Sequence, residues 1–107
     1  MSTPDLSAML AQAQQLQARM QEAQEQAKQK LVEGTAGGGM VTVEMTGGLE
    51  VRRVKIDPNI VDAKDVGMLE DLIAAATNQA LGKAQALQAD AIRTVTGGLS
   101  IPGMPGL

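Results

Sequence analysis

Residues 40–58, MVTVEMTGGLEVRRVKIDP, decide the fold, because apolar and polar residues alternate on both sides of two adjacent glycines. Alternation with a period of two is typical of a half-buried strand. Gly47-Gly48 is a two-residue hairpin signal, since both glycines tolerate positive φ, and residues 57–59, DPN, supply turn chemistry at the far end. The stretch therefore predicts an antiparallel hairpin of strands 40–46 and 49–56.

The predicted hairpin register separates the basic residues that crowd into its second strand. Pairing across the two glycines places Arg52 opposite Val43 and Arg53 opposite Thr42. Because strand side chains alternate, Arg53 and Lys55 then share one face and Arg52 extends from the other. Two interpretations stay open for this cluster: charge balance with neighbouring acids, or an anion site at Arg53 and Lys55.

The chain before the hairpin predicts a long helix and a short strand. Thr3 is a suitable N-cap for a helix over residues 3–30, with Pro4 in its first position and Asp5 near the positive end of its dipole. One stripe of this helix repeats at alternating intervals of three and four residues, the spacing of a coiled-coil seam: Leu6, Met9, Ala13, Leu16, Met20, Ala23 and Ala27. Residues 31–33 are then a candidate third strand, and GTAGGG at 34–39 is a flexible connection.

A second long helix is predicted over residues 65–96, with Asp62 or Asp65 as its cap. Its part at 68–81, MLEDLIAAATNQAL, is apolar around most of its circumference and should be covered on more than one side. Gly82 is a candidate for a close helix crossing. The fold class expected is α+β: a long first helix, a small antiparallel sheet of two to three strands, and a long second helix. Residues 1–96 form one domain, and 97–107 a Gly/Pro-rich flexible tail.

Composition limits both the core and the chemistry. The 107 residues include no Phe, Tyr, Trp, Cys or His, so a single chain has a thin core and homodimerisation is expected. Without His or Cys there is no usual metal-ligand set, thiol nucleophile or imidazole base. No catalytic residue, metal or cofactor is expected, and no membrane span. A cytoplasmic location is the default expectation.

Two motif-like stretches have structural explanations. The glycines at 37–39 lack the Lys-Ser/Thr pair of a phosphate-binding loop, and a strand follows them instead of a helix. Asp57, Asn59, Asp62 and Asp65 do not have the spacing of a calcium-binding loop, and turn and cap roles account for them.

The net charge of −3 argues against strong nonspecific DNA affinity but allows a localised basic surface. On the first helix, Arg19 can pair with Glu22, and Lys28 with Glu25, at a spacing of three. The candidate DNA-contacting residues are Arg19, Lys28, Lys30, Arg53, Lys55, Lys83 and Arg93. The candidate dimer interface comprises Val54, Ile56, Leu69, Leu72, Ile73 and Ala76.

Five stretches in this order resemble the YbaB/EbfC nucleoid-associated proteins: MLAQAQQLQARMQE, GTAGGGMVTVEMTG, RRVKIDP, MLEDLIAAATNQA and GGLSIPGMPG. The combination of KIDP with MLEDLIAAATNQA is the most specific part. The resemblance implies an intertwined bacterial homodimer whose long helices project like tweezers. It also implies binding to double-stranded DNA with weak sequence preference, altered DNA conformation, and a place in the nucleoid. A helix–hairpin–helix with a heptad seam also suits a coiled-coil chaperone or protein-interaction clamp, which is the alternative function.

Overall fold

The computed structural model describes residues 6–97 of the chain. The expected cap at Thr3, Pro4 and Asp5, and almost all of the expected 97–107 tail, lie outside the described residues. The elements follow in the order α1 (Leu6–Gln29), β1 (Leu31–Ala36), β2 (Val41–Thr46), β3 (Val51–Ile56), the 3-10 turn η1 (Pro58–Ile60) and α2 (Val66–Gly97). The predicted α+β fold with two long helices and a three-stranded antiparallel sheet is confirmed.

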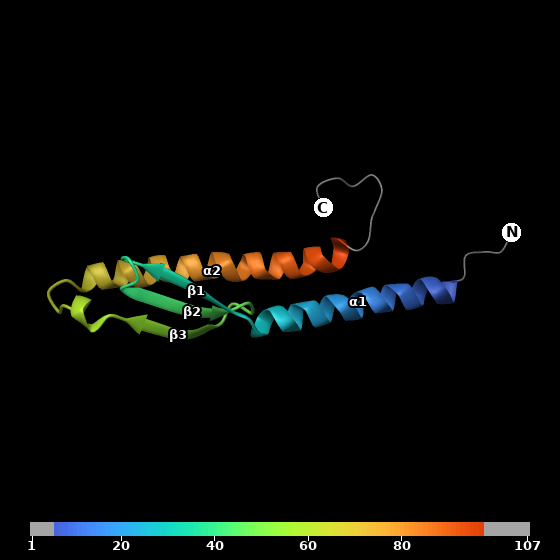
Figure 1. Cartoon of the computed structure of the whole chain (residues 1–107), viewed down its shortest axis with the longest axis horizontal. Helices are drawn as coiled ribbons and strands as arrows, with labels where there is room; N and C mark the ends of the chain where they lie inside the picture. Colours follow the sequence, from blue (N-terminus) through green and yellow to red (C-terminus); the bar gives the residue numbers. More distant parts are fainter. Residues whose placement is uncertain (1–5, 98–107) are drawn as a thin grey trace.

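The molecule is long and narrow, with principal extents of 79 × 25 × 16 Å. Figure 1 shows α2 running along the sheet and continuing past it, to lie beside α1, which projects away from the sheet. The strand order is β1-β2-β3, and α2 packs mainly on β1 and β2. One face of the sheet is therefore covered by a helix, and β3 lies at the margin of that cover.

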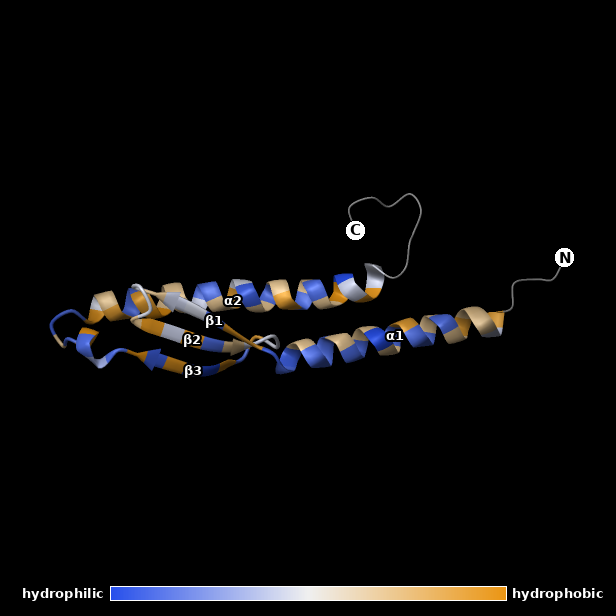
Figure 2. Ribbon diagram, in the orientation of Figure 1, coloured by the Kyte–Doolittle hydropathy of each residue, from blue (hydrophilic) through white to orange (hydrophobic). Residues whose placement is uncertain are grey.

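The core is built from small and β-branched side chains. Val41, Val43 and Met45 of β2 alternate toward α2, where Ala76, Ala80 and Ala84 receive them, and all six are buried. Alternation along β2 is visible in Figure 2 as a change between apolar and polar residues. The predicted apolar face of this strand is confirmed. The short alanine side chains permit the helix backbone to approach the sheet closely.

The first hairpin is longer than the sequence suggested. Residues 34–36 belong to β1 instead of a flexible connection, and Ala36 pairs with Val41. The turn consists of residues 37–40, with positive φ at Gly37, Gly38 and Gly39. Gly34 lies in this strand, and the position has to be glycine because a side chain there would strike the backbone of α2. An added Cβ would meet the Ala76 carbonyl oxygen.

The second hairpin corrects the predicted turn and register. Thr46 N–H donates to the Glu50 carbonyl and Leu49 N–H to that of Thr46, which makes a three-residue loop instead of a two-residue one. Positive φ occurs at Leu49 and not at Gly47 or Gly48. This is the three-residue loop in which a turn is followed by a left-handed residue.

The pairing predicted for the two arginines is wrong by two residues. Val43 pairs with Val54, and Glu44 pairs with Arg53. A bulge between Glu44 and Met45 leaves Arg52 without a partner in register, because Met45 pairs with Val51. The shift is even, so the predicted face of Arg53 and Lys55 is kept, opposite to the one that α2 covers.

The start of α2 follows the sequence signal, whereas Gly82 in the interior of the helix does not have the predicted role. Met68 N–H donates to Asp65 Oδ1 at 3.3 Å, so Asp65 caps α2, which is helical through Gly97, the last described residue. Gly82, however, does not mark a close crossing, since no atom lies within 4 Å of a Cβ built there. The α2 stretch 68–81 is covered on the sheet side, while Ala74 and Ala75 are exposed.

Candidate nucleic-acid interface

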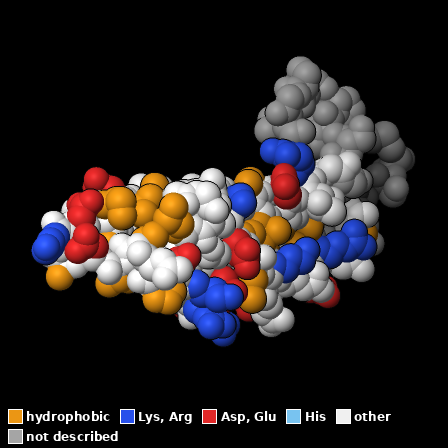
Figure 3. Space-filling view, turned by 60° about the vertical axis from the view of Figure 1, so that its left-hand side comes forward, with side chains coloured by type: hydrophobic (Ala, Val, Ile, Leu, Met, Phe, Trp, Pro, Cys, Tyr) orange, Lys and Arg blue, Asp and Glu red, His pale blue; other side chains and the backbone are white. Residues whose placement is uncertain are grey.

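The basic side chains do not form one continuous patch. Figure 3 shows the Lys and Arg side chains of one face in separate groups, with acidic and apolar side chains between them. Within residues 6–97 the structure holds two ion pairs, Lys28–Glu25 at 3.3 Å and Arg93–Asp90 at 3.0 Å. The candidate DNA-contacting residues therefore differ in whether they already have a partner.

The two candidate cations of α1 divide in this way. Lys28 pairs with Glu25, as the spacing predicted. Arg19 does not pair with Glu22, whose carboxylate instead accepts a 3.5 Å hydrogen bond from Gln26. Arg19 is exposed and forms no ion pair with another residue of 6–97, so its guanidinium is open to an anion.

On α2, both candidate cations are engaged. Lys83 Nζ donates at 2.8 Å to the backbone carbonyl of Glu33, at the outer edge of β1. Arg93 is held by Asp90, three residues earlier. Exposed ion pairs of this kind contribute only about 0.3–0.5 kcal/mol, so Arg93 and Lys28 can exchange their partners for phosphate more readily than Lys83 can leave the sheet.

Arg53 and Lys55 lie on the sheet face opposite α2. Lys55 pairs with Thr42, and Arg53 pairs with Glu44, which in turn pairs with Glu33 on β1. A row of two glutamates and one arginine thus crosses the three strands. Neither Arg53 nor Lys55 forms an ion pair in the described part of the chain. The register supports partial charge balance at Arg53, and Lys55 has no acid opposite it.

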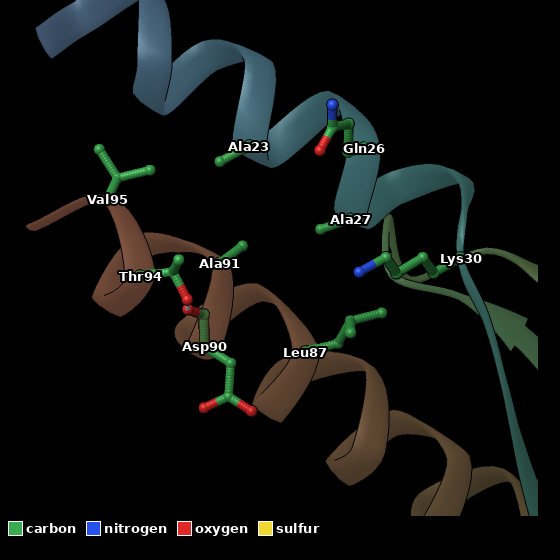
Figure 4. Close-up of a pocket in the computed structure, with 9 residues that line it drawn as sticks. All are labelled: Ala23, Gln26, Ala27, Lys30, Leu87, Asp90, Ala91, Thr94 and Val95. Atoms are coloured by element: carbon green, nitrogen blue, oxygen red, sulfur yellow. Dashed lines mark hydrogen bonds between the residues drawn. The ribbon is translucent and has the colours of Figure 1, made fainter. Parts of the chain in front are cut away.

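Lys30 stands where α1 joins β1. A narrow groove of about 200 Å³ runs between the two helices and is lined by Ala23, Ala27, Lys30, Leu87 and Val95, among others. In Figure 4, Lys30 reaches toward the groove, whereas the carboxylate of Asp90 points away from α1. The groove is smaller than the roughly 300–1,000 Å³ of ordinary ligand pockets. Its position makes it a helix–helix seam with one cation at its end.

The candidate dimer-interface residues fall into two groups. Ala76 is fully buried within the chain itself, which removes it from any surface offered to a second copy. Ile56, Leu69, Leu72 and Ile73 pack against the core and are partly exposed. Val54 is exposed, although its cross-strand partner, Val43, is completely buried. The apolar face of the sheet, which α2 covers at β1 and β2, is therefore uncovered at β3.

The two edge strands of the sheet, β1 and β3, differ in whether side chains bond to their outer backbone groups. At β1, Gln79 Oε1 accepts from Thr35 N–H at 2.7 Å, and Lys83 Nζ donates to the Glu33 carbonyl. Within residues 6–97, no side chain makes a hydrogen bond to the backbone of β3. The β1 edge is thus capped by α2, and the β3 edge is open to another strand.

Sequence patterns did not reveal the contacts that fix α1 against the rest of the chain. Gly47 N–H donates to the Lys30 carbonyl at 3.0 Å, and the Gln88 amide donates to the Gly47 carbonyl. A Cβ at Gly47 would collide with the Ala27 carbonyl. The adjacent glycines at 47 and 48 mark this junction in the sequence. We interpreted them as a turn, whereas Gly47 is also the point of close contact with α1.

The acidic residues near η1 have local structural roles. Asp57 Oδ1 accepts from Asn59 N–H, and Asp62 Oδ1 from Lys64 N–H, each at 2.9 Å. Asp65 caps α2. In the described part of the chain, no three acidic side chains converge as metal ligands would. Neither helix of residues 6–97 combines the length and the apolar character that crossing a membrane requires.

Comparison with known proteins gives a consistent result. The model of the YbaB/EbfC DNA-binding family matches residues 1–99. A nucleoid-associated protein of Afipia carboxidovorans is 48% identical over 100 residues, covering 94% of this chain and 95% of its own. One of Thermoanaerobacter pseudethanolicus is 46% identical, covering 94% and 90%. The crystal structure of an uncharacterized Helicobacter pylori protein has the same fold, with a TM-score of 0.69 at 19% identity, covering 92% of this chain and all of the other.

Proposed function

The chain belongs to the YbaB/EbfC DNA-binding family, and on that premise we propose that it binds duplex DNA as a homodimer through phosphate contacts from its unpaired basic side chains. The family is one of DNA-binding proteins and not of enzymes. The relatives' names place them at the nucleoid, and we extend this cytoplasmic location to the chain. The observation that carries the proposal is that Arg19, Lys30, Arg53 and Lys55 form no ion pair with any residue of 6–97.

Dimerisation is supported by the state of β3. Val51 and Val54 are 49% and 42% exposed, although they pair with the buried residues Met45 and Val43. Such half-exposed valines on the apolar side of a sheet mark a face that a second copy can cover. The open edge of β3 points to the same side, whereas the β1 edge is capped by Gln79 and Lys83. We therefore place the dimer contact at β3 and include in it the partly exposed residues Leu69, Leu72 and Ile73 of α2.

A dimer carries twice the negative net charge of the chain, but it also presents each basic side chain twice. Symmetry doubles these four candidate cations, and the long α1 helices hold two of the resulting eight at a distance from the sheets. Phosphate contacts position a protein on DNA without reading its sequence. The proposal therefore includes weak sequence preference, with the many Gln side chains of α1 available to sugar and phosphate oxygens.

The test is a fluorescence-anisotropy titration of duplex DNA at several salt concentrations. If about six phosphates are neutralised per dimer, log K falls with log salt with a slope of about −5. The variant Arg53→Gln/Lys55→Gln removes four cations per dimer and should reduce the magnitude of this slope by about 3–4. The matched control, Lys28→Gln/Arg93→Gln, removes the same charge from residues that already have acidic partners and should change the slope less.

Two results would contradict the proposal. Affinity that does not change with salt would exclude the phosphate mechanism altogether. Equal slopes for the β3 variant and the wild-type chain would exclude Arg53 and Lys55 from the site. Circular dichroism must accompany both, because Arg53 lies beside Glu44, and losing its charge leaves the Glu33–Glu44 pair unbalanced. Like charges opposite each other cost about 0.2–1 kcal/mol.

One observation favours the second candidate, a clamp for protein surfaces. The first turns of α1 expose Leu6, Met9 and Leu10 on the projecting part of the molecule. Exposed Leu and Met side chains suit adaptable protein contacts. DNA binding that persists when Leu6 and Met9 are replaced by Ser would separate the two functions, since phosphate contacts do not need these side chains.

A further inference from the structure

The apolar stripe of α1 is covered at one end of the helix and bare at the other. Ala27 is 2% exposed, Ala23, Met20 and Leu16 are partly buried, and Leu6 is 77% exposed. The groove residues show that Leu87, Ala91 and Val95 of α2 provide the cover over Ala23 and Ala27. Coverage therefore falls as α1 passes the end of α2 at Gly97.

The bare part has the pattern of a packed helix face. Leu6, Met9 and Leu10 are exposed large apolar residues, and Ala13 follows at the same helical spacing. Residues three and four apart share one side of a helix, so these four form a single strip. Figure 2 shows apolar residues concentrated in these first turns. A contiguous exposed apolar strip of this kind is typical of a surface that another segment or protein covers.

We propose that residues 98–107 of the same chain, GLSIPGMPGL, dock on this strip, formed by Leu6, Met9, Leu10 and Ala13. The segment has no charged residue and carries Leu99, Ile101, Met104 and Leu107. Pro102 and Pro105 cannot continue a helix and favour an extended chain, which suits a segment lying across a helix face. Its chemistry therefore matches the strip that it would cover.

The position and length of the segment are also suitable. It starts immediately after Gly97, where α2 ends beside the middle of α1 (Figure 1). Ten residues of α1, 6–15, precede the partly buried part, a distance of about 15 Å at the helical rise. Ten residues in extended form span about 33 Å, so the segment reaches the whole strip.

A segment of the same chain has an advantage over a second copy. Attachment gives it an effective concentration in the millimolar range for a short flexible link, above ordinary protein concentrations. The uncovered side of the sheet at β3, where we place the second copy, lies well away from the beginning of α1 in Figure 1. The docking proposal stands on the α1 strip alone and does not depend on DNA binding.

Hydrogen exchange measured by mass spectrometry tests the proposal. The full chain is compared with a chain ending at Gly97, and we expect amides of residues 6–16 to exchange roughly tenfold faster in the shorter chain. A full-length Ile101→Ser/Met104→Ser variant should reproduce the acceleration, while the matched control Ser100→Ala should not. The exchange of the β2 amides serves as the internal standard, because β2 packs against α2 in the core and does not touch the strip.

A reciprocal variant, Leu6→Ser/Met9→Ser, keeps the core intact and should accelerate exchange in residues 98–107. Unchanged exchange of residues 6–16 in both the shortened chain and the Ile101→Ser/Met104→Ser variant would overturn the proposal. Protection that rises with protein concentration and survives removal of the segment would also overturn it, by assigning the strip to a second copy.

Discussion

Gly34 of β1 lies directly against Ala80 of α2, so close that a Cβ added to the glycine would stand 2.9 Å from the Ala80 Cβ. The same Cβ would meet the Ala76 carbonyl oxygen and the Ala80 nitrogen at shorter range still. These are backbone atoms in the middle of a long helix and have little freedom to move. The pair therefore sets the distance between the helix layer and the sheet.

Gly34→Ala should consequently destabilise the protein by at least about 2 kcal/mol, the range expected for overpacking a well-packed core. Gly82→Ala is the matched control on α2, the helix that Gly34 faces, since a Cβ at Gly82 meets nothing within 4 Å. The control should stabilise by about 0.5–1 kcal/mol, because alanine is the better helix former. Urea denaturation at one fixed protein concentration measures both, and equal effects of the two substitutions would contradict the assigned contact.

Gly34 also illustrates how much of the fold could be predicted from the sequence. Periodicity correctly predicted both helices, the strand pair and the sheet faces, because alternation reports on which face of a strand is buried. The heptad stripe of α1, by contrast, is covered only between Leu16 and Ala27, and its first turns are exposed. Periodicity did not predict that Gly34 belongs to a strand, since a glycine in GTAGGG has the same local signature as a flexible connection. The reason lies 42 residues further along the chain, in the backbone of Ala76.

The prediction of the second hairpin's turn and register was wrong for a related reason. The Gly47-Gly48 pair favours a two-residue turn locally, yet Gly47 is needed as a contact for Ala27, and the left-handed position falls on Leu49. The register consequently moved by two residues and a bulge formed at Arg52. Among the candidate basic residues, sequence spacing predicted the Lys28–Glu25 pair, but the partner of Lys83 is a backbone carbonyl on another element. Spacing along one helix carries no information about such a contact.

The capped edge of β1 gives a second prediction. Gln79→Ala/Lys83→Ala removes both side chains that occupy the edge groups of Thr35 and Glu33. An open edge strand is a template for pairing with another chain, so association beyond the dimer should increase with concentration. Sedimentation velocity over a concentration series measures this.

The control for that experiment is Asn78→Ala/Gln85→Ala, which removes two exposed polar side chains of α2 that do not bond to the sheet. It should sediment like the wild-type chain. If the edge variant also does so, the role of Gln79 and Lys83 is limited to joining α2 to β1.

A third prediction concerns Gln88 of α2, which holds the Gly47 loop on which the end of α1 packs. Gln88→Leu keeps the side-chain size but removes the hydrogen bond to the Gly47 carbonyl. Stability should fall by about 1 kcal/mol, as for an ordinary intramolecular hydrogen bond, and exchange of the α1 amides should accelerate more than that of β2. Gln85→Leu, an exposed position one turn earlier, is the control. Uniform acceleration in α1 and β2 would show that the bond stabilises the whole domain and does not specifically hold α1.

The last prediction is that Leu49→Gly stabilises the protein. Leu49 has a φ of 66°, in the left-handed region where a residue with a Cβ is disfavoured by about 1–2 kcal/mol. Glycine relieves this cost but adds freedom to the unfolded chain, which leaves an expected gain of about 0.5–1 kcal/mol. The hairpin geometry does not depend on the side chain, because the Thr46 hydroxyl accepts from the Gly48 and Glu50 amides.

Leu49→Ala separates the backbone effect from the side-chain effect. It removes the exposed leucine side chain but retains a Cβ at the same φ, so it should give no gain. The two variants are compared by their urea midpoints at equal protein concentration, which keeps the dimer equilibrium constant. If glycine lowers stability as much as alanine does, the leucine side chain must be making a contact in the assembled dimer that outweighs the backbone strain. That result would extend the surface assigned to the second copy from β3 into the adjoining loop.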